Sequence, residues 1–558
     1  MKPCEIHQRT LLGAILQSRS EAFDSGENSH LLRDLATREY NAFLWFALIS
    51  ITVLLLGEVV RLLRVWVKAK KIPGPPCPSF YGHCKLISRE NFTDLLAESH
   101  EKYGSLVKLW LGPTQLLVSI TDPMLIKEML LKAADKLPLS GRAFHLAFGQ
   151  SSLFASSFDK VQKKRKLLGQ ELDGMLLERA DLIPEKVIAS FMDRIQKIMA
   201  KGNIDCKFVS QHMAFTIMGA TFFGDDFLAW SKAAVYEELL MMISKDACFW
   251  ASYNVTPFWK QGFWRYQRLC SKLKCLTQDI FQQCQKNCNI FHHRDQIVQN
   301  ETLNIQIETA SGAKSCSDAV FQDFSKLGDH HNATEEPCGN IMRMMLHGCQ
   351  TTTGLIDNML SRLAMHPEIQ DKIYSEIVMV GKESLEHDQQ DVYKMLLLLA
   401  TVYESARLLP AGRFLQRCSL KHDLSLHTGV TIPAGAVLVV PVHLVQMDDS
   451  SWGPDASKFN PYRFLSNARK GSDVVLDTSS TGSLEELKAR RFSSFVFSDP
   501  NDNAAFLLFG SGTRACVGQR FVIQQVATLF ASLLKKYERR PRASDIAMSS
   551  NFKLDYVQ

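Results

Sequence analysis

The chain has 558 residues, of which 46% are hydrophobic, so it can bury one large core. Its net charge of +6 is modest, and no run of lysines and arginines is interleaved with aromatic residues, which argues against a nucleic-acid partner. The 14 cysteines follow no regular spacing, so they argue against a disulfide-stapled secreted module and favour a reducing compartment.

An uncharged apolar run marks the N-terminal region. The stretch AFLWFALISITVLLLG covers residues 42–57, and the residues up to 60 extend it to about the length of a membrane-spanning helix. Basic side chains follow it, at Arg61, Arg64, Lys68, Lys70 and Lys71. The positive-inside rule therefore predicts a transmembrane anchor at 42–60, with a lumenal leader at 1–41 and the rest of the chain in the cytosol.

A basic and proline-rich linker is predicted at residues 61–76. Pro73, Pro75 and Pro76 cannot continue a helix, and Gly74 adds a turn. We therefore expect one globular domain at 77–558, set at a fixed angle to the membrane by this linker.

The globular domain is predicted to be mainly α with a minor β region. Apolar residues recur at helical spacing in eight segments, at 92–103, 122–133, 184–200, 233–244, 339–364, 368–380, 390–409 and 517–537. Short alternating runs indicate strands, at 106–110, 115–120 and 436–440. Two long polar stretches, 300–336 and 466–503, exceed ordinary loop lengths and are interpreted as insertions.

A glycine-rich stretch near the C-terminus, FLLFGSGTRACVGQRF, holds a single cysteine, Cys516. A cysteine thiolate is a haem ligand, and it is costly to bury unless nearby groups compensate its charge. Gly510 and Gly512 let the backbone turn so that amide N–H groups can face the sulfur, and a helix beginning after Val517 would add its positive end. The alternative interpretation is an ordinary glycine-rich turn with a buried thiol.

The neighbours of this cysteine suit a haem. Gly518 would let the following helix approach a porphyrin, and Arg514 can reach a propionate with its fork of donors. Phe509 and Gly512 complete the five spaced positions of the pattern.

With these residues, and with three further motifs in a fixed order, the chain resembles the cytochrome P450 family from residue 73 onward. The motif ESAR supplies Glu404 and Arg407, and FNPYRF supplies Arg463, which together are similar to the family's buried charged triad. Arg417 stands where the family has a second propionate-binding arginine. The resemblance implies the cytochrome P450 fold behind a single transmembrane helix, a haem b cofactor and a single-pass location in the endoplasmic reticulum membrane.

The segment LHGCQTTTGLI matches the family's distal helix but departs from it at two positions. His347 replaces a small residue and Gln350 replaces an acid, whereas Gly348, Thr351 and Thr352 are kept. The resemblance implies that Thr351 relays protons, that Gln350 and Thr352 order water, and that Gly348 relaxes the helix ladder. His347 admits two interpretations, a core histidine turned away from the porphyrin or a distal group close to the iron.

A second departure lies in the segment FDKVQKKRKLL. Arg165 is kept as a propionate contact, but Val161 stands where the family usually has tryptophan. Neighbouring basic residues favour a docking patch for an NADPH-dependent flavoprotein reductase, with a solvated helix face as the alternative. They are Lys160, Lys163, Lys164, Lys166 and Arg520.

The predicted function is a monooxygenase that inserts one atom of dioxygen into a lipophilic small molecule, such as a terpenoid, sterol or fatty-acid-like compound. Substrate contacts are expected from the distal helix, the loop at 137–157 and the segment after Pro410. Two alternatives stay open: a haem-thiolate isomerase or dehydratase that does not activate oxygen, and a degenerate haem protein without enzymatic activity.

Overall fold

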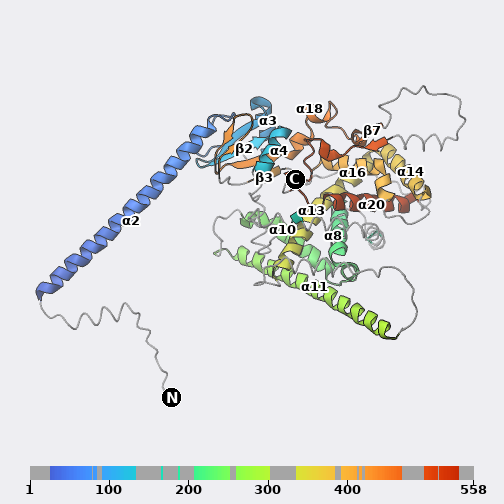
Figure 1. Ribbon diagram of the computed structural model, residues 1–558, viewed down its shortest axis with the longest axis horizontal. Coiled ribbons are helices and arrows are strands. Elements are labelled where there is room, and N and C mark those ends of the chain that lie inside the picture. Colours follow the sequence, from blue (N-terminus) through green and yellow to red (C-terminus); the bar gives the residue numbers. More distant parts are fainter. Residues whose placement is uncertain are drawn as a thin grey trace, which may run out of the picture. The chain divides into compact units, whose positions relative to one another are not determined.

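The computed structural model describes most of the chain (Figure 1). The described residues are 26–77, 79–83, 91–132, 165–166, 187–188, 206–251, 259–301, 335–383, 391–410, 412, 414–417, 422–467, 495–512 and 515–538. The chain divides into two compact units, Met1–Lys71 and Ile72–Gln558.

The first unit contains one long helix, α2 (Gly26–Ala69). Its part from Ala36 to Ala69 is long and apolar enough to cross a membrane. Large apolar side chains, including Trp45, Phe46 and Leu54, are exposed along it, as a helix that packs on lipid requires. The predicted anchor at 42–60 lies inside this helix, which continues into both flanking segments.

The second unit contains a four-stranded sheet with the strand order β1-β2-β6-β3. Strands β1 (Leu106–Leu111) and β2 (Gln115–Ile120) pair antiparallel, β2 and β6 (Val437–Pro441) pair parallel, and β3 (Phe414–Arg417) pairs antiparallel with β6. Most of the side chains in β1, β2 and β6 are buried, because helices cover the sheet.

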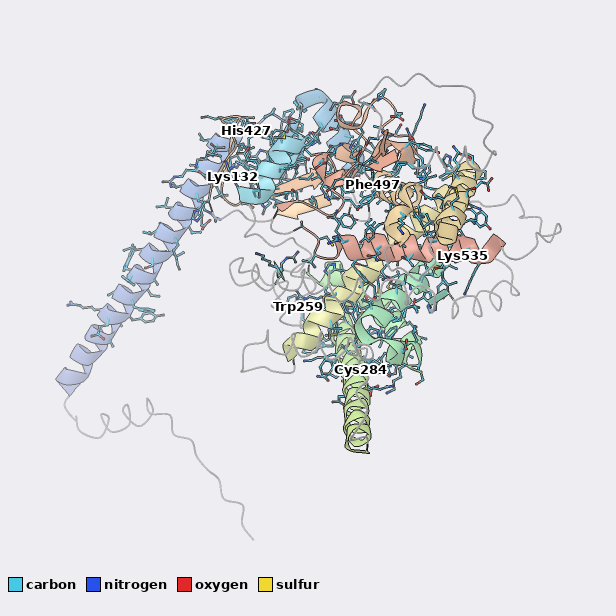
Figure 2. The ribbon with its side chains drawn as sticks, turned by 45° about the vertical axis from the view of Figure 1, so that its right-hand side comes forward. Lys132, Trp259, Cys284, His427, Phe497 and Lys535 are labelled. Carbon is cyan, nitrogen blue, oxygen red and sulfur yellow. The ribbon has the colours of Figure 1, made fainter. Side chains whose placement is uncertain are left out.

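A cluster of polar contacts ties helix α4 (Pro123–Lys132) to the turn between β4 (Leu424–Ser425) and β5 (Thr431–Ile432). Glu128 accepts from Lys132 Nζ at 2.6 Å and lies 2.6 Å from His427 Nδ1. Lys132 and His427 approach each other from the two elements (Figure 2). Hydrogen bonds from Lys132 and then from His427 lower the pKa of Glu128 to about 2.

The helical part packs around α13 (Glu335–Met365), the central helix in Figure 1. One apolar cluster joins α13 to α8 (Cys206–Phe223), α10 (Ala233–Ala251) and α11 (Gln261–Glu301). A second cluster joins it to α8 and to helices that include α16 (Leu396–Leu408) and α20 (Gln519–Glu538). Helices α13, α16 and α20 carry or flank the predicted site residues.

Shorter elements complete the second unit. The helices are α3 (Phe92–Tyr103), α9 (Asp225–Leu228), α14 (Pro367–Glu383), α15 (Asp391–Lys394), α17 (Val442–Gln446) and α18 (Asp449–Trp452). The others are the 3-10 helices η2 (Pro461–Phe464) and η3 (Pro500–Asp502), and the paired strands β7 (Leu465–Asn467) and β8 (Phe495–Phe497).

The predicted mainly α fold with a minor sheet is confirmed, with differences in detail. The single helix predicted at 390–409 is two helices, α15 and α16, separated by Met395. Helix α8 was missed because it is buried on most of its surface and so lacks an amphipathic period. The helix predicted at 184–200 lies almost entirely outside the described residues, as do most of the two polar stretches.

Candidate active site

The loop before Cys516 is closed by backbone hydrogen bonds. Cys516 N donates to Phe509 O at 2.7 Å, and Ala515 N donates to Gly512 O at 3.0 Å. Gly510 and Gly512 both have φ near +72°, a left-handed conformation that only glycine adopts without strain. The loop then enters α20, so the cysteine stands just before the positive end of that helix.

Opposing effects act on the Cys516 thiol. The side chain is open to solvent on one side, while the protein packed around it desolvates the sulfur and raises its pKa. The backbone N–H of Gly518 and the charge of Arg165 lower this pKa and offset part of the effect. The Gly518 N–H and the Arg165 charge therefore offset the effect of desolvation only in part.

The residues around Cys516 fit a haem. A Cβ atom placed on Gly518 would meet no protein atom within 4 Å, so protein packing does not require glycine there and a flat group can approach. The sulfur is accessible, and thiolate is a common axial ligand of haem iron. A Cβ atom on Gly512 would instead lie 3.3 Å from Leu131 Cδ2 of α4, which packs against the loop.

The predicted arginines lie in three different settings. Arg165 donates from Nη2 to Ala515 O at 2.8 Å, and its Nε is buried without a partner among the described residues. Arg417 ends β3, where it pairs with Leu438 of β6. Arg514 lies outside the described residues, as does the loop at 137–157.

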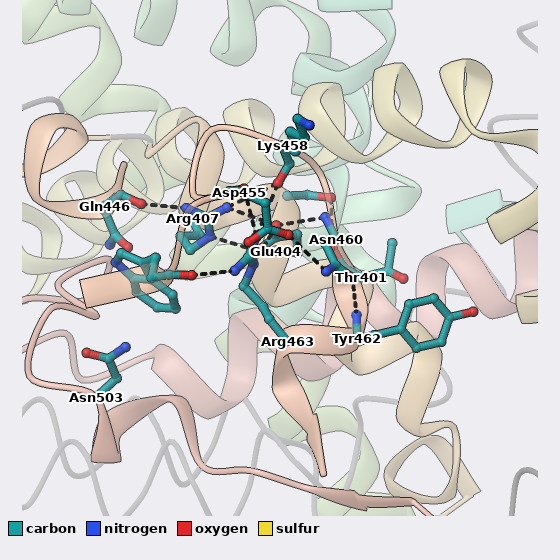
Figure 3. A network of polar contacts seen from close by, with 12 residues as sticks. Thr401, Glu404, Arg407, Gln446, Asp455, Lys458, Asn460, Tyr462, Arg463 and Asn503 are labelled. Atoms are coloured by element: carbon teal, nitrogen blue, oxygen red, sulfur yellow. Dashed lines mark hydrogen bonds and ion pairs between the residues drawn. The ribbon is translucent and has the colours of Figure 1, made fainter. Parts of the chain in front are cut away.

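Glu404, Arg407 and Arg463 come together as a buried network (Figure 3). Glu404 Oε2 accepts from Arg407 Nε at 2.7 Å, and Glu404 Oε1 accepts from Arg463 Nε at 3.0 Å. The side chains of Glu404 and Arg407 are fully buried. Charges buried this completely persist only when every polar atom is satisfied.

Backbone groups satisfy the rest of this network. Arg463 donates to Trp452 O at 2.8 Å and to Asp455 O at 3.1 Å, while Arg407 donates to Gln446 O. Asn460 N donates to Glu404 Oε1 at 2.9 Å. The network thereby binds the irregular segment after α18 to helix α16, and Figure 3 shows this segment folded around the carboxylate.

The predicted distal residues lie on different faces of α13. Gln350 and Thr351 are exposed, whereas Thr352 is buried and its hydroxyl has no hydrogen-bond partner in the described residues. Thr351 Oγ1 donates to His347 O at 2.8 Å and to Gly348 O at 3.4 Å. Thr351 and Gln350 thus share the accessible face, and the hydroxyl of Thr352 points into the helix packing.

Helix α13 continues through Gly348. A Cβ atom there would lie 2.3 Å from Met218 Cε of α8. The glycine therefore permits close packing of two helices, and the sequence could not show this because Met218 is distant in the chain.

His347 lies half-buried one turn before Thr351. Burial and then the positive charge of Arg343 lower the pKa of His347 to about 4. Arg343 is itself buried one turn earlier on the same helix, and burial lowers its pKa to about 10. The imidazole is therefore neutral at physiological pH.

Comparison with known proteins agrees with this fold. The profile of the family "Cytochrome P450" matches residues 72–556. Cytochrome P450 3A31 of Mesocricetus auratus is 25% identical over 85% of this chain and 86% of its own length. The 11-oxo-beta-amyrin 30-oxidase of Glycyrrhiza uralensis is 24% identical over 79% of this chain and 77% of its own length.

The helical fold, the cysteine loop and the buried ion-pair network define a haem-thiolate protein. The chain belongs to the cytochrome P450 family. Family membership makes it a monooxygenase, an oxidoreductase that uses haem, dioxygen, an organic substrate and a redox partner. The predicted family and enzyme class are thus confirmed.

Proposed function

We propose that this protein is a membrane-anchored haem b monooxygenase that inserts one oxygen atom into a lipophilic small molecule, with electrons from an NADPH-dependent flavoprotein reductase. The observation that carries the proposal is the closed loop that presents the accessible Cys516 sulfur at the start of α20. When bound, the haem supplies an iron centre for dioxygen chemistry.

On the proximal side, Cys516 is the proposed iron ligand. Phe509 and Gly512 shape its loop through the hydrogen bonds to Cys516 N and Ala515 N, and Gly518 leaves room for the porphyrin. The proposed propionate contacts are Arg165, Arg417 and Arg514. The network of Glu404, Arg407 and Arg463 supports the segment beneath the loop.

On the distal side, the Thr351 hydroxyl is the proposed proton relay, because it is exposed and held by the carbonyl of His347. Gln350 is also exposed and orders water, but its amide cannot ionise. Thr352 has a buried hydroxyl, so its proposed contact with water requires a water molecule buried inside the protein. Proton delivery through Gln350 is therefore slower than through a carboxylate.

The proposed substrate is a terpenoid, sterol or fatty-acid-like compound. The relative from Glycyrrhiza uralensis is named as an oxidase of 11-oxo-beta-amyrin, and this supports an apolar polycyclic substrate. The apolar part of α2 supports insertion in the endoplasmic reticulum membrane, with the second unit in the cytosol. The same location gives access to a membrane-bound reductase and to lipophilic compounds.

The decisive experiment is a carbon monoxide spectrum of the reduced, haem-loaded protein, compared with that of the Cys516→Ala variant. We expect a thiolate-type Soret band in the natural protein and its loss in the variant. Retention of the band in the variant would overturn the proposed ligand. Turnover of a bound lipophilic compound without NADPH and reductase would instead favour the isomerase alternative.

A further inference from the structure

The peptide group between Ala515 and Cys516 is held at both of its polar ends. Its N–H belongs to Cys516 and donates to Phe509 O at 2.7 Å. Its carbonyl belongs to Ala515 and accepts from Arg165 Nη2 at 2.8 Å. A planar peptide fixed at both ends cannot rotate about its neighbouring bonds, and it sets the direction in which the Cys516 side chain leaves the backbone.

The second of these bonds comes from a distant part of the chain. The first contact closes the loop on itself, whereas Arg165 reaches the loop from outside it. Arg165 is partly buried, and a hydrogen bond from a charged donor is stronger in such a setting than a neutral one. The guanidinium therefore restrains the loop as an external clamp.

Arg165 also keeps donors for another group. Within the part of the chain that the structure describes, its Nε is buried without a hydrogen-bond partner, although the Nη2 atom is bound to Ala515 O. A guanidinium presents its donors in a rigid planar fork, so one side can hold the loop while the other faces an anionic group. A propionate contact and a loop contact are thus compatible in one side chain.

We propose that Arg165 is a positioning residue for the Cys516 ligand, acting through the carbonyl of Ala515. The inference rests on the proposed function, in which Cys516 binds the haem iron. It goes beyond a propionate contact, because a propionate contact needs only positive charge near the porphyrin edge. The restraint on the loop instead needs the planar guanidinium of Arg165 at hydrogen-bonding distance from the carbonyl of Ala515.

Two variants and a control test the clamp. Arg165→Lys keeps the charge and loses the fork, and Arg165→Gln loses both. Lys535→Gln removes a charge from an exposed residue of α20, the helix that follows the Cys516 loop, and serves as the control. The readouts are hydrogen exchange of the Cys516 amide, followed by mass spectrometry, and the carbon monoxide spectrum of the reduced haem-loaded protein.

For both Arg165 variants we expect the Cys516 amide to exchange about tenfold faster, since a charged donor to the peptide is lost. We also expect part of the Soret band to leave its thiolate position. The Lys535→Gln protein should match the natural one. If Arg165→Gln does not load haem, Arg165→Lys and exchange in the unloaded full chain give the same comparison, because the contact is made within the protein.

If the Arg165→Lys protein has the same Cys516 amide exchange rate and the same spectrum as the natural protein, the proposed clamp is wrong, since positive charge alone would then suffice. Faster loss of haem without faster exchange at Cys516 would also overturn it and assign Arg165 to the cofactor only. The proposed function fails separately, if Cys516→Ala keeps the thiolate band while the exchange result stands.

Discussion

The two sides of the proposed haem site are built differently. On the proposed proximal side, the fully buried Glu404 holds Arg407 and the partly buried Arg463, and backbone carbonyls accept further hydrogen bonds from both arginines. On α13, Gln350 and Thr351 are exposed, and the hydroxyl of Thr352 has no hydrogen-bond partner among the residues described. The proximal side is therefore fixed by the protein itself, whereas the distal side leaves polar groups available to what binds there.

The largest expected effect comes from breaking the proximal network. Glu404→Gln leaves the buried Arg407 and the partly buried Arg463 without this carboxylate, and removal of one partner from a buried ion pair costs about 3–5 kcal/mol of stability. We expect a much lower melting temperature and poor haem retention. Thermal unfolding monitored by circular dichroism measures the first, and the Soret absorbance measures the second.

Asp455→Asn is the matched control for this network. Its carboxylate lies 3.4 Å from Arg463 but is 40% exposed, so its loss should change the melting temperature little. Equal losses in Asp455→Asn and Glu404→Gln would show that the buried carboxylate is not the centre of the network.

The distal side should respond in chemistry more than in stability. Thr351→Ala removes the exposed hydroxyl, and we expect the product formed per NADPH oxidised to fall about tenfold or more, because general acid–base relays contribute at least that much. Thr351→Ser should retain most of the product yield. The measurement is the ratio of product to NADPH consumed, with hydrogen peroxide as the complementary product.

Gln350→Glu tests the departure at the neighbouring position. An ionisable group there should raise the product yield, since it can pass a proton and the amide cannot. An unchanged yield in both Thr351→Ala and Gln350→Glu would mean that protons reach the site by another route and that this face of α13 is not the relay.

The sequence predicted more of the proximal side than of the distal side, for a physical reason. The cysteine loop depends on local turns, so glycines at 510 and 512 and the cysteine at 516 reveal it directly. Glu404 and Arg463 are far apart in the sequence, and a family resemblance was needed to group them. The loop contact of Arg165 was missed because its partner is a backbone carbonyl, which no residue type reveals.

Gly348 shows the same limit on the distal helix. The sequence suggested a relaxed ladder, but the residue that requires a glycine is Met218 of α8. Gly348→Ala should gain helix propensity but must displace the flexible Met218 side chain, so we expect a small net loss of stability, about 1 kcal/mol or less. Chemical denaturation measures the free energy of unfolding.

A double-mutant cycle with Met218→Ala assigns this cost to the contact. In that background Gly348→Ala should be neutral or stabilising, since the clash is removed and the helix propensity remains. An unchanged cost in the Met218→Ala background would mean that Gly348 is required for another reason, such as the local backbone of α13.

The smallest expected effect concerns the pH dependence of the proximal side. Helix α16, which carries Glu404 and Arg407, has no capping side chain of its own at Met395. Glu376 of α14 caps it instead, accepting from Leu397 N at 2.8 Å and from Leu398 N at 3.0 Å. Burial raises the pKa of Glu376 to about 7, despite these hydrogen bonds.

A carboxyl group whose pKa is raised on folding binds its proton more tightly in the folded state. Its contribution to stability is complete below the ordinary pKa of about 4.5 and is lost as pH rises toward about 7. The natural protein should therefore melt at a lower temperature at pH 8 than at pH 5. Glu376→Gln, which cannot ionise, should reduce this difference by roughly 2 °C or more, whereas Glu98→Gln on the exposed face of α3 should leave it unchanged. If Glu376→Gln and the natural protein lose stability in parallel, the proximal side owes its pH dependence to groups other than the α16 cap.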